Sequence, residues 1–355
     1  MLKWGILGTG NIAHTFATAL QVSQKCELVA VGSRSKESAE KFAKEFNLKH
    51  SFGSYAELLT FEHVDIVYIS TPHPQHYELA LLAARAGKHM LIEKPMAMNE
   101  VQVRKILGVA HKYKVFVMEA YMYRCHPQTA KVVELIKSDA LGQVKFIRAS
   151  FSFDGRPLGP SSRLWRKELG GGAIMDIGGY PLSFARLIAE ITQIRDASTT
   201  AELIKVKATG YIQPESQVDE WSNAALEFNN NITAQLFAGI FSDTDSSVEV
   251  LGSKGSLKIL NLWRPDLPQL GPVQIEYTEY GKKKQIIPIE LDETNLFVYE
   301  ADAVAEAVIR GQRQCKFMTW RDSLEQVRAM DAWRKEIGLQ YKEDTEFVDT
   351  QDEYF

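Results

Sequence analysis

Short apolar runs alternate with helical spacings over about the first 120 residues of the chain. The runs predict buried strands at Lys3–Leu7, Leu28–Gly32, Ile66–Ser70, Met90–Glu93 and Val115–Met118. Apolar residues three and four positions apart predict intervening helices at Asn11–Val22, Lys36–Phe46, His76–Ala86 and Glu100–Tyr113. Because strand–helix alternation builds a parallel sheet with helices on both faces, we expect a doubly wound α/β domain over residues 1–122.

The pattern changes after about residue 125, where predicted strands follow one another without helices between them. A helix at Gln128–Lys137 and a long strand at Gln143–Phe153 precede strands at Ala224–Phe228, Thr233–Ile240, Val248–Leu251 and Ser256–Leu260. Tight turns such as Asn229-Asn230-Asn231 make neighbouring strands antiparallel. Residues 123–355 are therefore expected to form an α+β domain with a large open, mainly antiparallel sheet. Its closing helices, Asn295–Arg310 and Trp320–Ile337, can pack back on the first domain.

The composition excludes several classes of protein. The net charge is -4 and no stripe of basic residues is present, so we expect neither nucleic acid nor a membrane as a partner. Three widely spaced cysteines, Cys26, Cys125 and Cys315, indicate a reducing compartment rather than a disulfide framework. We expect a cytoplasmic protein, because the N-terminus lacks a signal-peptide pattern and no apolar run is long enough to span a bilayer. No metal centre is predicted, and the acidic residues 343–355 predict a solvated tail.

A glycine-rich turn lies between the first predicted strand and the first predicted helix. Gly8-Thr9-Gly10-Asn11-Ile12-Ala13 fits the pattern G-x-G-x-x-A. Gly8 allows the tight turn, Gly10 lets a pyrophosphate approach the backbone, and Ala13 lets the helix pack closely on the strand. The N–H groups and the positive end of the helix stabilise bound phosphates. The turn therefore predicts a dinucleotide-binding site.

The end of the second predicted strand indicates which dinucleotide binds. NAD-selective sites carry a carboxylate here that holds the ribose hydroxyls, whereas this strand ends in Ser33-Arg34-Ser35-Lys36. Arg34 can stack on the adenine and, with Ser33, bind a 2′-phosphate that a carboxylate would repel. We therefore expect a preference for NADP(H), with NAD(H) as the alternative cofactor. A solvent-exposed arginine without a ligand is the alternative interpretation of Arg34.

Two further strand ends are expected at the cofactor crevice. The loop Thr71-Pro72-His73-Pro74-Gln75-His76 can place His76 or Gln75 beside the nicotinamide ribose, although its two prolines also suit a simple rigid turn. Glu93-Lys94-Pro95 ends the next strand, and ligands bind at the carboxyl ends of parallel strands. Pro95 restricts the backbone and so aims Lys94. The alternative is a solvated loop lysine.

A second glycine-rich segment completes a pattern that resembles a known family. This segment is Gly170-Gly171-Gly172-Ala173-Ile174-Met175-Asp176-Ile177-Gly178-Gly179-Tyr180. With the glycine turn and Glu93-Lys94-Pro95, it resembles the Gfo/Idh/MocA oxidoreductases over nearly the whole chain. Met118-Glu119-Ala120, followed by Arg124 and Pro127, resembles the branch of the dimeric dihydrodiol dehydrogenases and the NADP-dependent D-xylose dehydrogenases.

The resemblance implies that Lys94 and Tyr180 are catalytic and that a nicotinamide cofactor lies against the first domain, contacted also by Glu93. The inositol dehydrogenases of the family have a histidine where this chain has Tyr180, which argues against inositol as the substrate. An unperturbed phenol has a pKa of about 10, and a nearby ammonium lowers it. Tyr180 would then donate a proton as hydride reaches a carbonyl carbon, while Lys94 stabilises the oxyanion. We expect the ammonium and the phenol to meet beside the nicotinamide.

Several other polar residues are candidates for the substrate pocket. Asp176 lies four residues before Tyr180, so on an α-helix both share one face; a helix-start acid is the alternative. Glu119 can reach the nicotinamide region or act as a structural carboxylate. The weaker candidates are Arg124, His126, Trp165 and Arg166. Each of these also suits a surface cation, a packed aromatic or an ion-pair partner.

The leading hypothesis is an NADP(H)-dependent oxidoreductase. It would transfer a hydride between nicotinamide and a CH–OH or C=O centre of a sugar, anhydrosugar or cyclic trans-diol. One alternative is a non-catalytic dinucleotide-binding sensor, against which the presence of both Lys94 and Tyr180 argues. Another is a redox-assisted glycosidase, against which the tyrosine argues. The open sheet of the second, substrate-binding domain is expected to expose an apolar face that a homodimer covers.

Overall fold

The computed structural model describes residues 1–193, 200–243 and 246–345. These residues fall into two compact units. The first contains Met1–Cys125 and Asn295–Val327, together with the described residues from Glu343 onward; the second contains His126–Thr294 and Arg328–Lys342. The chain thus returns to the first unit after completing most of the second.

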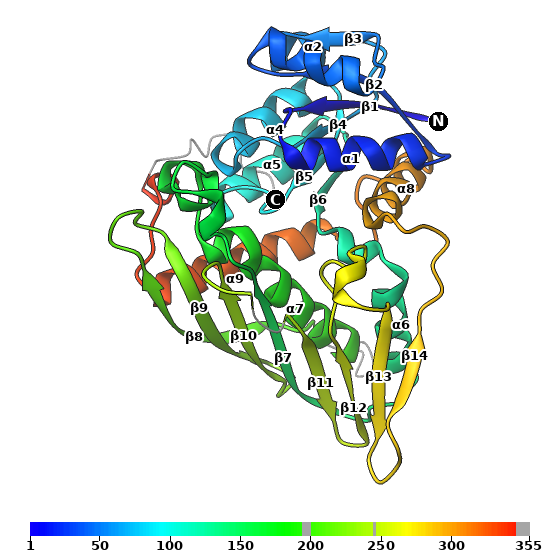
Figure 1. Ribbon diagram of the computed structural model, residues 1–355, viewed down its shortest axis with the longest axis vertical. Coiled ribbons are helices and arrows are strands. Elements are labelled where there is room, and N and C mark those ends of the chain that lie inside the picture. Colours follow the sequence, from blue (N-terminus) through cyan, green and yellow to red (C-terminus); the bar gives the residue numbers. More distant parts are fainter. Residues whose placement is uncertain (194–199, 244–245, 346–355) are drawn as a thin grey trace. The chain divides into compact units, whose positions relative to one another are not determined.

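The first unit is built on a six-stranded parallel sheet (Figure 1). Its strands are β1 (Leu2–Leu7), β2 (Cys26–Gly32), β3 (His50–Phe52), β4 (Ile66–Ile69), β5 (His89–Glu93) and β6 (Val117–Ala120), in the order β3-β2-β1-β4-β5-β6. This order is the one usual for dinucleotide-binding folds, and it confirms the predicted doubly wound class. The sequence prediction omitted β3, because its three residues are too few and too exposed to give an apolar run.

Helices follow each of the first five strands. They are α1 (Asn11–Val22), α2 (Lys36–Glu45), α3 (Tyr55–Thr60), α4 (His76–Arg85) and α5 (Glu100–Lys112), and α8 (Leu296–Ile309) packs against α1. Side chains cap three of these helices: Ser35, Ser54 and Asn99 accept hydrogen bonds from the N–H groups of Ser38, Glu57 and Gln102. The register pairs Leu7 with Ile69 and Ile69 with Ile92. The carboxyl ends of β1, β4 and β5 therefore lie at one edge of the sheet.

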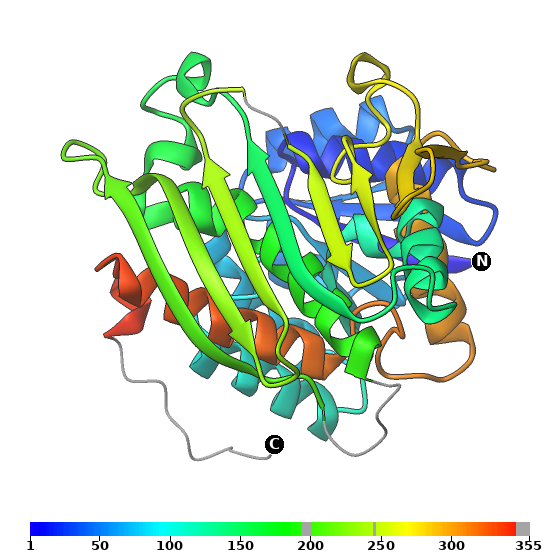
Figure 2. The ribbon, with the colours of Figure 1, turned by 90° about the horizontal axis from the view of Figure 1, so that it is seen from below.

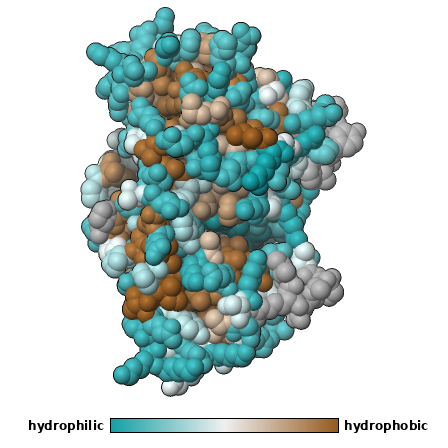
Figure 3. Space-filling view, turned by 90° about the vertical axis from the view of Figure 1, so that its right-hand side faces the viewer, coloured by the Kyte–Doolittle hydropathy of each residue, from teal (hydrophilic) through white to brown (hydrophobic). Residues whose placement is uncertain are grey.

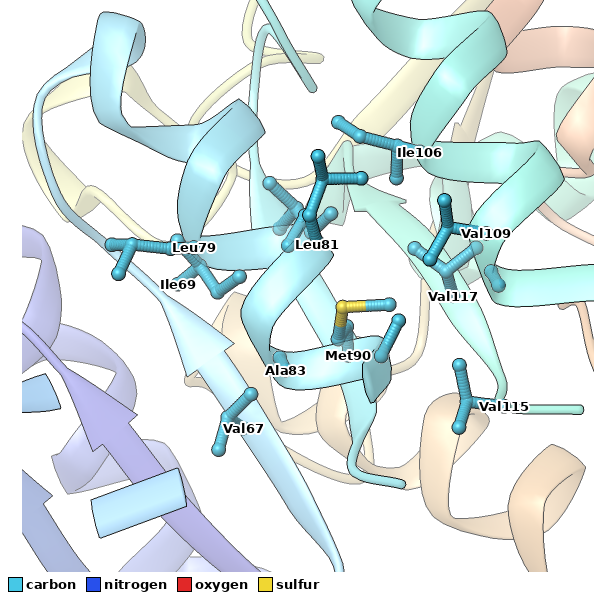
Figure 4. Close-up of a cluster of buried hydrophobic side chains, with 14 of the residues drawn as sticks. Val67, Ile69, Leu79, Leu81, Ala83, Met90, Ile106, Val109, Val115 and Val117 are labelled. Carbon is cyan, nitrogen blue, oxygen red and sulfur yellow. The ribbon is translucent and has the colours of Figure 1, made fainter. Parts of the chain in front are cut away.

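One face of this sheet packs on α4 and α5 in a dense hydrophobic core. Figure 4 shows side chains from β4, β5 and β6 meeting side chains of the two helices. The labelled residues are Val67, Ile69, Leu79, Leu81, Ala83, Met90, Ile106, Val109, Val115 and Val117, all buried. Burial on this scale fixes the strands, and with them the loops at their carboxyl ends.

The second unit is built on an eight-stranded, mainly antiparallel sheet, as expected. Its strands are β7 (Val144–Ser152), β8 (Leu203–Ile212), β9 (Asp219–Phe228), β10 (Thr233–Gly239), β11 (Val248–Gly252), β12 (Gly255–Ile259), β13 (Gln274–Glu279) and β14 (Gln285–Pro288). Their order is β14-β13-β12-β11-β7-β10-β9-β8, and only β7 and β10 pair in parallel. The helices are α6 (Pro127–Lys137), α7 (Gly179–Gln193) and α9 (Trp320–Glu336), which begins in the first unit and ends in the second.

The outer face of the eight-stranded sheet differs from the expectation of an apolar surface. Figure 2 shows the strands in front and α7 behind them, and α7 packs on β7 and β10. On the opposite face the outward positions are mostly polar or charged, among them Arg148, Lys207, Glu227, Thr233 and Gln235. The half-buried aromatic residues Phe146, Trp221 and Phe237 lie among them, so this face mixes polar and apolar side chains rather than being apolar throughout.

The surface carries both hydrophilic and hydrophobic side chains. Hydrophilic residues predominate on the face drawn in Figure 3, with hydrophobic residues in separate groups among them. Within the described part of the chain, no helix combines the length and the apolar character needed to cross a bilayer.

Candidate active site

The turn between β1 and α1 has the backbone geometry that a bound pyrophosphate needs. Gly8 has a φ of 116°, and a Cβ there would lie 3.2 Å from the carbonyl oxygen of Ser70. At Gly10 a Cβ would meet nothing within 4 Å, so the backbone is open to a ligand. α1 starts at Gly10 without a side-chain cap and without an acid in its first turn. Its N–H groups can therefore bind phosphate oxygens. Asn11 is exposed and Thr9 and Ile12 are half-buried at this turn.

The loop after β4 holds buried polar atoms that have no hydrogen-bond partner within the described protein. Thr71 Oγ1 and Gln75 Oε1 are both in this state. A buried polar atom without a partner is costly, and a bound ligand that supplies one removes the cost. The neighbouring Pro72 is half-buried and His73 is buried. Thr71 Oγ1 and Gln75 Oε1 can therefore hydrogen-bond to a ligand at this loop.

Buried side chains fix the turn that presents Lys94. The Lys94–Pro95 peptide bond is cis, and Lys94 itself is half-buried. His76 is fully buried, and its two ring nitrogens lie 2.9 Å from the oxygen of Pro95 and 2.8 Å from that of Thr71. Glu119 Oε1 accepts a hydrogen bond of 2.9 Å from the N–H of Met96. His76 and Glu119 therefore hold the backbone that directly follows the lysine, at Pro95 and Met96.

Glu93 is buried directly before Lys94 and belongs to the interior of the unit. Its carboxylate accepts a hydrogen bond from the hydroxyl of Tyr68. Glu300 on α8 is also fully buried, and burial, followed by the charge of Glu93, raises the pKa of Glu300 well above its usual value. This shift favours the neutral form of Glu300, because two adjacent buried charges would be costly.

Arg34 is exposed at the carboxyl end of β2, where no acid precedes it in the strand tip. It interacts with Tyr55, whose pKa is raised by burial and lowered in part by the charge and hydrogen bond of Arg34. Ser33 is buried, and its hydroxyl lies 3.4 Å from the N–H of Ser35. The tip thus offers a cation and a hydroxyl without a competing carboxylate.

In the second unit, Asp176 and Tyr180 follow the glycine-rich segment. Ile174–Gly178 forms a π-helical turn, and α7 begins at Gly179, so the expectation of one continuous α-helical face was wrong. Such turns are frequent at functional sites. Asp176 is buried and accepts a hydrogen bond of 2.7 Å from Arg163. The ring of Tyr180 lies 5.3 Å from that of Phe151, centroid to centroid.

Asp219 on β9 holds the start of this segment, and the sequence analysis missed it. Its Oδ2 accepts a hydrogen bond of 2.8 Å from the N–H of Ile174. Gly172 has a φ of 108°, and a Cβ there would lie 2.2 Å from Asp219 Oδ1. The hydroxyl of Tyr341 donates to the oxygen of Gly171. Complete burial raises the pKa of Asp219 to about 7. A lone aspartate at a strand start gives no signal that distinguishes this role from a surface acid.

For the four weaker candidates the sequence left two roles open, one in the substrate pocket and one structural. The contacts of these residues in the structure are those of the structural role. Arg124 is buried, with its guanidinium 3.4 Å from Asp322 and 3.2 Å from the oxygen of Phe317. Trp165 is packed in the interior and donates to the oxygen of Gly155, and Arg166 pairs with Glu168 at the surface. His126 is buried, caps α6, and burial lowers its pKa to about 4.

The Asp219→Asn variant is expected to change how stability depends on pH. The pKa of Asp219 is about 7 in the folded protein against 3.8 for an ordinary carboxyl, so its ionisation opposes folding. The protonated carboxyl of Asp219 therefore stabilises the folded protein fully below pH 3.8. This stabilisation is lost as the pH rises through 7. The asparagine can still accept from Ile174 but does not titrate.

Urea unfolding of wild type and Asp219→Asn at pH 5 and pH 8 tests this. Relative to the variant, the wild type should lose up to about 3 kcal/mol between the two pH values. The neighbouring Glu220→Gln is the control and should track the wild type. A constant difference between wild type and Asp219→Asn would show that Asp219 is ionised throughout.

Comparison with known proteins assigns the chain to a family. Residues 2–121 match the oxidoreductase family described as an NAD-binding Rossmann fold, and residues 129–258 match the GFO/IDH/MocA C-terminal domain. The trans-1,2-dihydrobenzene-1,2-diol dehydrogenase of Xenopus laevis is 32% identical over 342 residues, covering 96% of this chain and 99% of the relative. The human enzyme of that name is 27% identical over 349 residues, covering 97% of this chain and 99% of its own.

Solved structures agree with this assignment. KijD10, a 3-ketoreductase from Actinomadura kijaniata in complex with NADP and TDP-benzene, superposes with a TM-score of 0.82 at 28% identity, covering 95% of this chain and 98% of its own. An aldose-aldose oxidoreductase from Caulobacter crescentus, at 22% identity and a TM-score of 0.82, shares the fold over 94% of this chain and 97% of its own. The chain therefore belongs to the Gfo/Idh/MocA family of oxidoreductases, in the branch of the dihydrodiol dehydrogenases, and is a dehydrogenase or reductase.

Proposed function

We propose that this enzyme uses NADP(H) to interconvert a CH–OH group and a carbonyl group on a sugar, an anhydrosugar or a cyclic trans-diol. The observation that supports the proposal most strongly is the aligned edge of the parallel sheet. There the open glycine turn, the buried atoms of the Thr71 loop and the fixed Lys94 turn follow the ends of β1, β4 and β5. The names of the relatives, a dihydrodiol dehydrogenase and a 3-ketoreductase, support the substrate class.

The proposed mechanism gives each catalytic side chain one task. When bound, the nicotinamide supplies or accepts the hydride. In the direction of reduction, the phenol of Tyr180 donates its proton to the substrate oxygen, and in oxidation the phenolate accepts it. The ammonium of Lys94 stabilises the negative charge that develops on that oxygen. Asp176, fixed by Arg163, orients a substrate hydroxyl.

Removal of either catalytic group should lower turnover while the fold persists. For Lys94→Met and Tyr180→Phe we expect kcat to fall on the order of 100-fold or more, because proton transfer and oxyanion stabilisation are lost. The measurement is NADPH absorbance at 340 nm in a screen of sugars, anhydrosugars and trans-diols in both directions. Lys41→Met and Tyr211→Phe, at exposed positions, are the matched controls. Near-wild-type turnover in either catalytic variant would refute the role of that residue.

The preference for NADP(H) is proposed from the tip of β2. Arg34 is exposed there beside Ser33, and no carboxylate competes for the ribose. The presence of NADP in the KijD10 complexes supports the same choice. Because one charge-assisted contact to phosphate is lost, Arg34→Gln should lower kcat/KM with NADP⁺ by about tenfold or more and leave kcat/KM with NAD⁺ nearly unchanged. Arg85→Gln, an exposed arginine on α4, is the control. An equal loss with both cofactors would contradict the proposal.

A homodimer through the outer face of the eight-stranded sheet is also proposed. This face has a depression of about 590 Å³ lined by Arg148, Asn223, Gln235 and Phe237, among others. A half-buried aromatic among polar groups is typical of the centre of an interface. Light scattering should give twice the chain mass of 40.0 kDa, and Phe237→Asp should give the single-chain mass. A wild-type protein that scatters as a single chain at micromolar concentration would contradict this.

A reducing, cytoplasmic location is proposed from the cysteines. Cys26 and Cys315 are buried, Cys125 is half-buried, and all three are free thiols. Burial raises the pKa of each of these thiols, which makes them poor nucleophiles. They behave as small packing residues, as a protein of a reducing compartment allows.

A further inference from the structure

A histidine on the first helix binds the glycine turn from outside the G-x-G-x-x-A pattern. His14 lies on α1, four residues after Gly10, and its Nδ1 atom lies 2.9 Å from the carbonyl oxygen of Gly10. Because a carbonyl oxygen can only accept a hydrogen bond, Nδ1 is the donor. The backbone N–H of His14 donates to the same oxygen at 3.2 Å, so the side chain makes the shorter of the two bonds.

Contacts on its other sides fix the ring of His14. Nε2 lies 3.3 Å from Oε2 of Glu45, the last residue of α2. The ring packs edge-on to that of Phe42, at 4.6 Å between centroids, and lies 5.7 Å from that of Phe46. Both phenylalanines are buried. Turning Nδ1 away from Gly10 would therefore break the contacts that link α1 to α2.

The hydrogen bond bears on the cofactor site through the peptide group that joins Gly10 to Asn11. This peptide is trans and planar, so its C=O and its N–H point in opposite directions. The carbonyl of Gly10 points along α1, and the N–H of Asn11 therefore points out of the start of the helix. It is one of the donors that a helix leaves without a partner, and such donors bind phosphate. Holding the carbonyl thus also aims a donor to the pyrophosphate.

The two ends of the glycine turn are held in different ways. At its beginning the sheet anchors the backbone, since the hydroxyl of Ser70 on the neighbouring strand end donates to the oxygen of Leu7 at 3.0 Å. At its end, no side chain of the described residues caps α1, and the first turn of the helix holds no acid. A Cβ at Gly10 would meet nothing within 4 Å, so packing does not fix this end either. The bond from His14 fulfils that task.

We propose that His14 is a positioning residue for the pyrophosphate of the dinucleotide cofactor, acting through the carbonyl group of Gly10. The proposal needs the dinucleotide site of the family, but neither the preference for NADP(H) nor the substrate class proposed above. NAD(H) and NADP(H) share the pyrophosphate and differ at the 2′ position of the ribose. His14 therefore supports the binding of both to the same extent, whereas Arg34 is proposed to act on NADP(H) alone.

The test compares two substitutions of the same shape. On a helix, threonine can donate its hydroxyl to the carbonyl oxygen four residues earlier, as Thr15 and Thr18 do on α1 at 3.2 Å and 2.9 Å. Valine has the same shape without the hydroxyl. His14→Val should raise the Kd of both NADPH and NADH by about fivefold, the effect of one lost hydrogen bond, and His14→Thr should stay within about twofold of the wild type. Isothermal titration calorimetry without substrate gives these constants.

Urea unfolding separates a positioning role from a merely structural one. Both variants lose the ring contacts with Phe42 and Phe46, so both should unfold at lower urea concentrations than the wild type. A structural role would lower the cofactor affinity of both, whereas the proposal predicts weak binding only in His14→Val. Equal Kd values for the two variants, whether raised or unchanged, overturn the proposal. His14→Ala, which also lacks a donor, replaces His14→Val if the valine prevents folding.

His63→Val is the matched control. His63 also faces a glutamate, with Nε2 3.9 Å from Glu62, and its ring packs edge-on to that of Phe61 at 5.1 Å. It precedes β4, however, and so belongs to the amino end of that strand, whereas the site lies at the carboxyl ends. Both Kd values should stay unchanged in this variant, and a rise equal to that in His14→Val would overturn the proposal.

The same titrations keep this proposal apart from the proposed function. The predicted Kd values in a protein that turns over no sugar, anhydrosugar or diol would refute the proposed function and leave the role of His14 intact. A loss of affinity for NADPH alone would place the effect at the 2′-phosphate and contradict a role at the pyrophosphate. A wild type that binds neither cofactor would refute both proposals.

Discussion

The parallel register of the six-stranded sheet is the constraint on which the cofactor side of this enzyme depends. Leu7, Ile69 and Ile92 occupy the same level in adjacent strands, so the residues that follow them emerge at one edge. Those residues are the glycine turn, the Thr71 loop and the Lys94 turn. Apart from the tip of β2, the sequence between these segments has mainly to bury enough apolar surface to keep the register.

Buried polar side chains then hold the loops that follow the strands in fixed positions. His76 and Glu119 bind the backbone around Lys94, and in the second unit Asp219 binds the backbone at Ile174. A buried polar group costs free energy unless it is hydrogen-bonded, so the hydrogen bond of each of these side chains holds its loop to the core. Lys94 and Tyr180, the groups proposed to react, thus lie on backbone segments held by residues that themselves need not touch a substrate.

The sequence predicted those features that depend on local pattern. The doubly wound domain, the open antiparallel sheet and the glycine turn follow from periodicity and from residues whose backbone conformations are restricted. The features it did not predict depend on contacts between distant segments. Asp219 acts 45 residues away from Ile174, and the ring of Trp263, in the segment after β12, lies 5.9 Å from the ring of Tyr180. The π-helical turn before α7 and the mixed polar and apolar outer face of the sheet also required the structure, because neither alters the spacing of apolar residues in the sequence enough to be recognised.

The account as a whole rests on hydride transfer from a nicotinamide to a substrate carbon. Its most direct test uses NADPH that carries deuterium at C4, in its two stereoisomeric forms, with a carbonyl compound that the enzyme reduces. The account predicts that one form, and not the other, places its deuterium on the new carbinol carbon, as seen by mass spectrometry and NMR of the product. A product without deuterium from either form would contradict it.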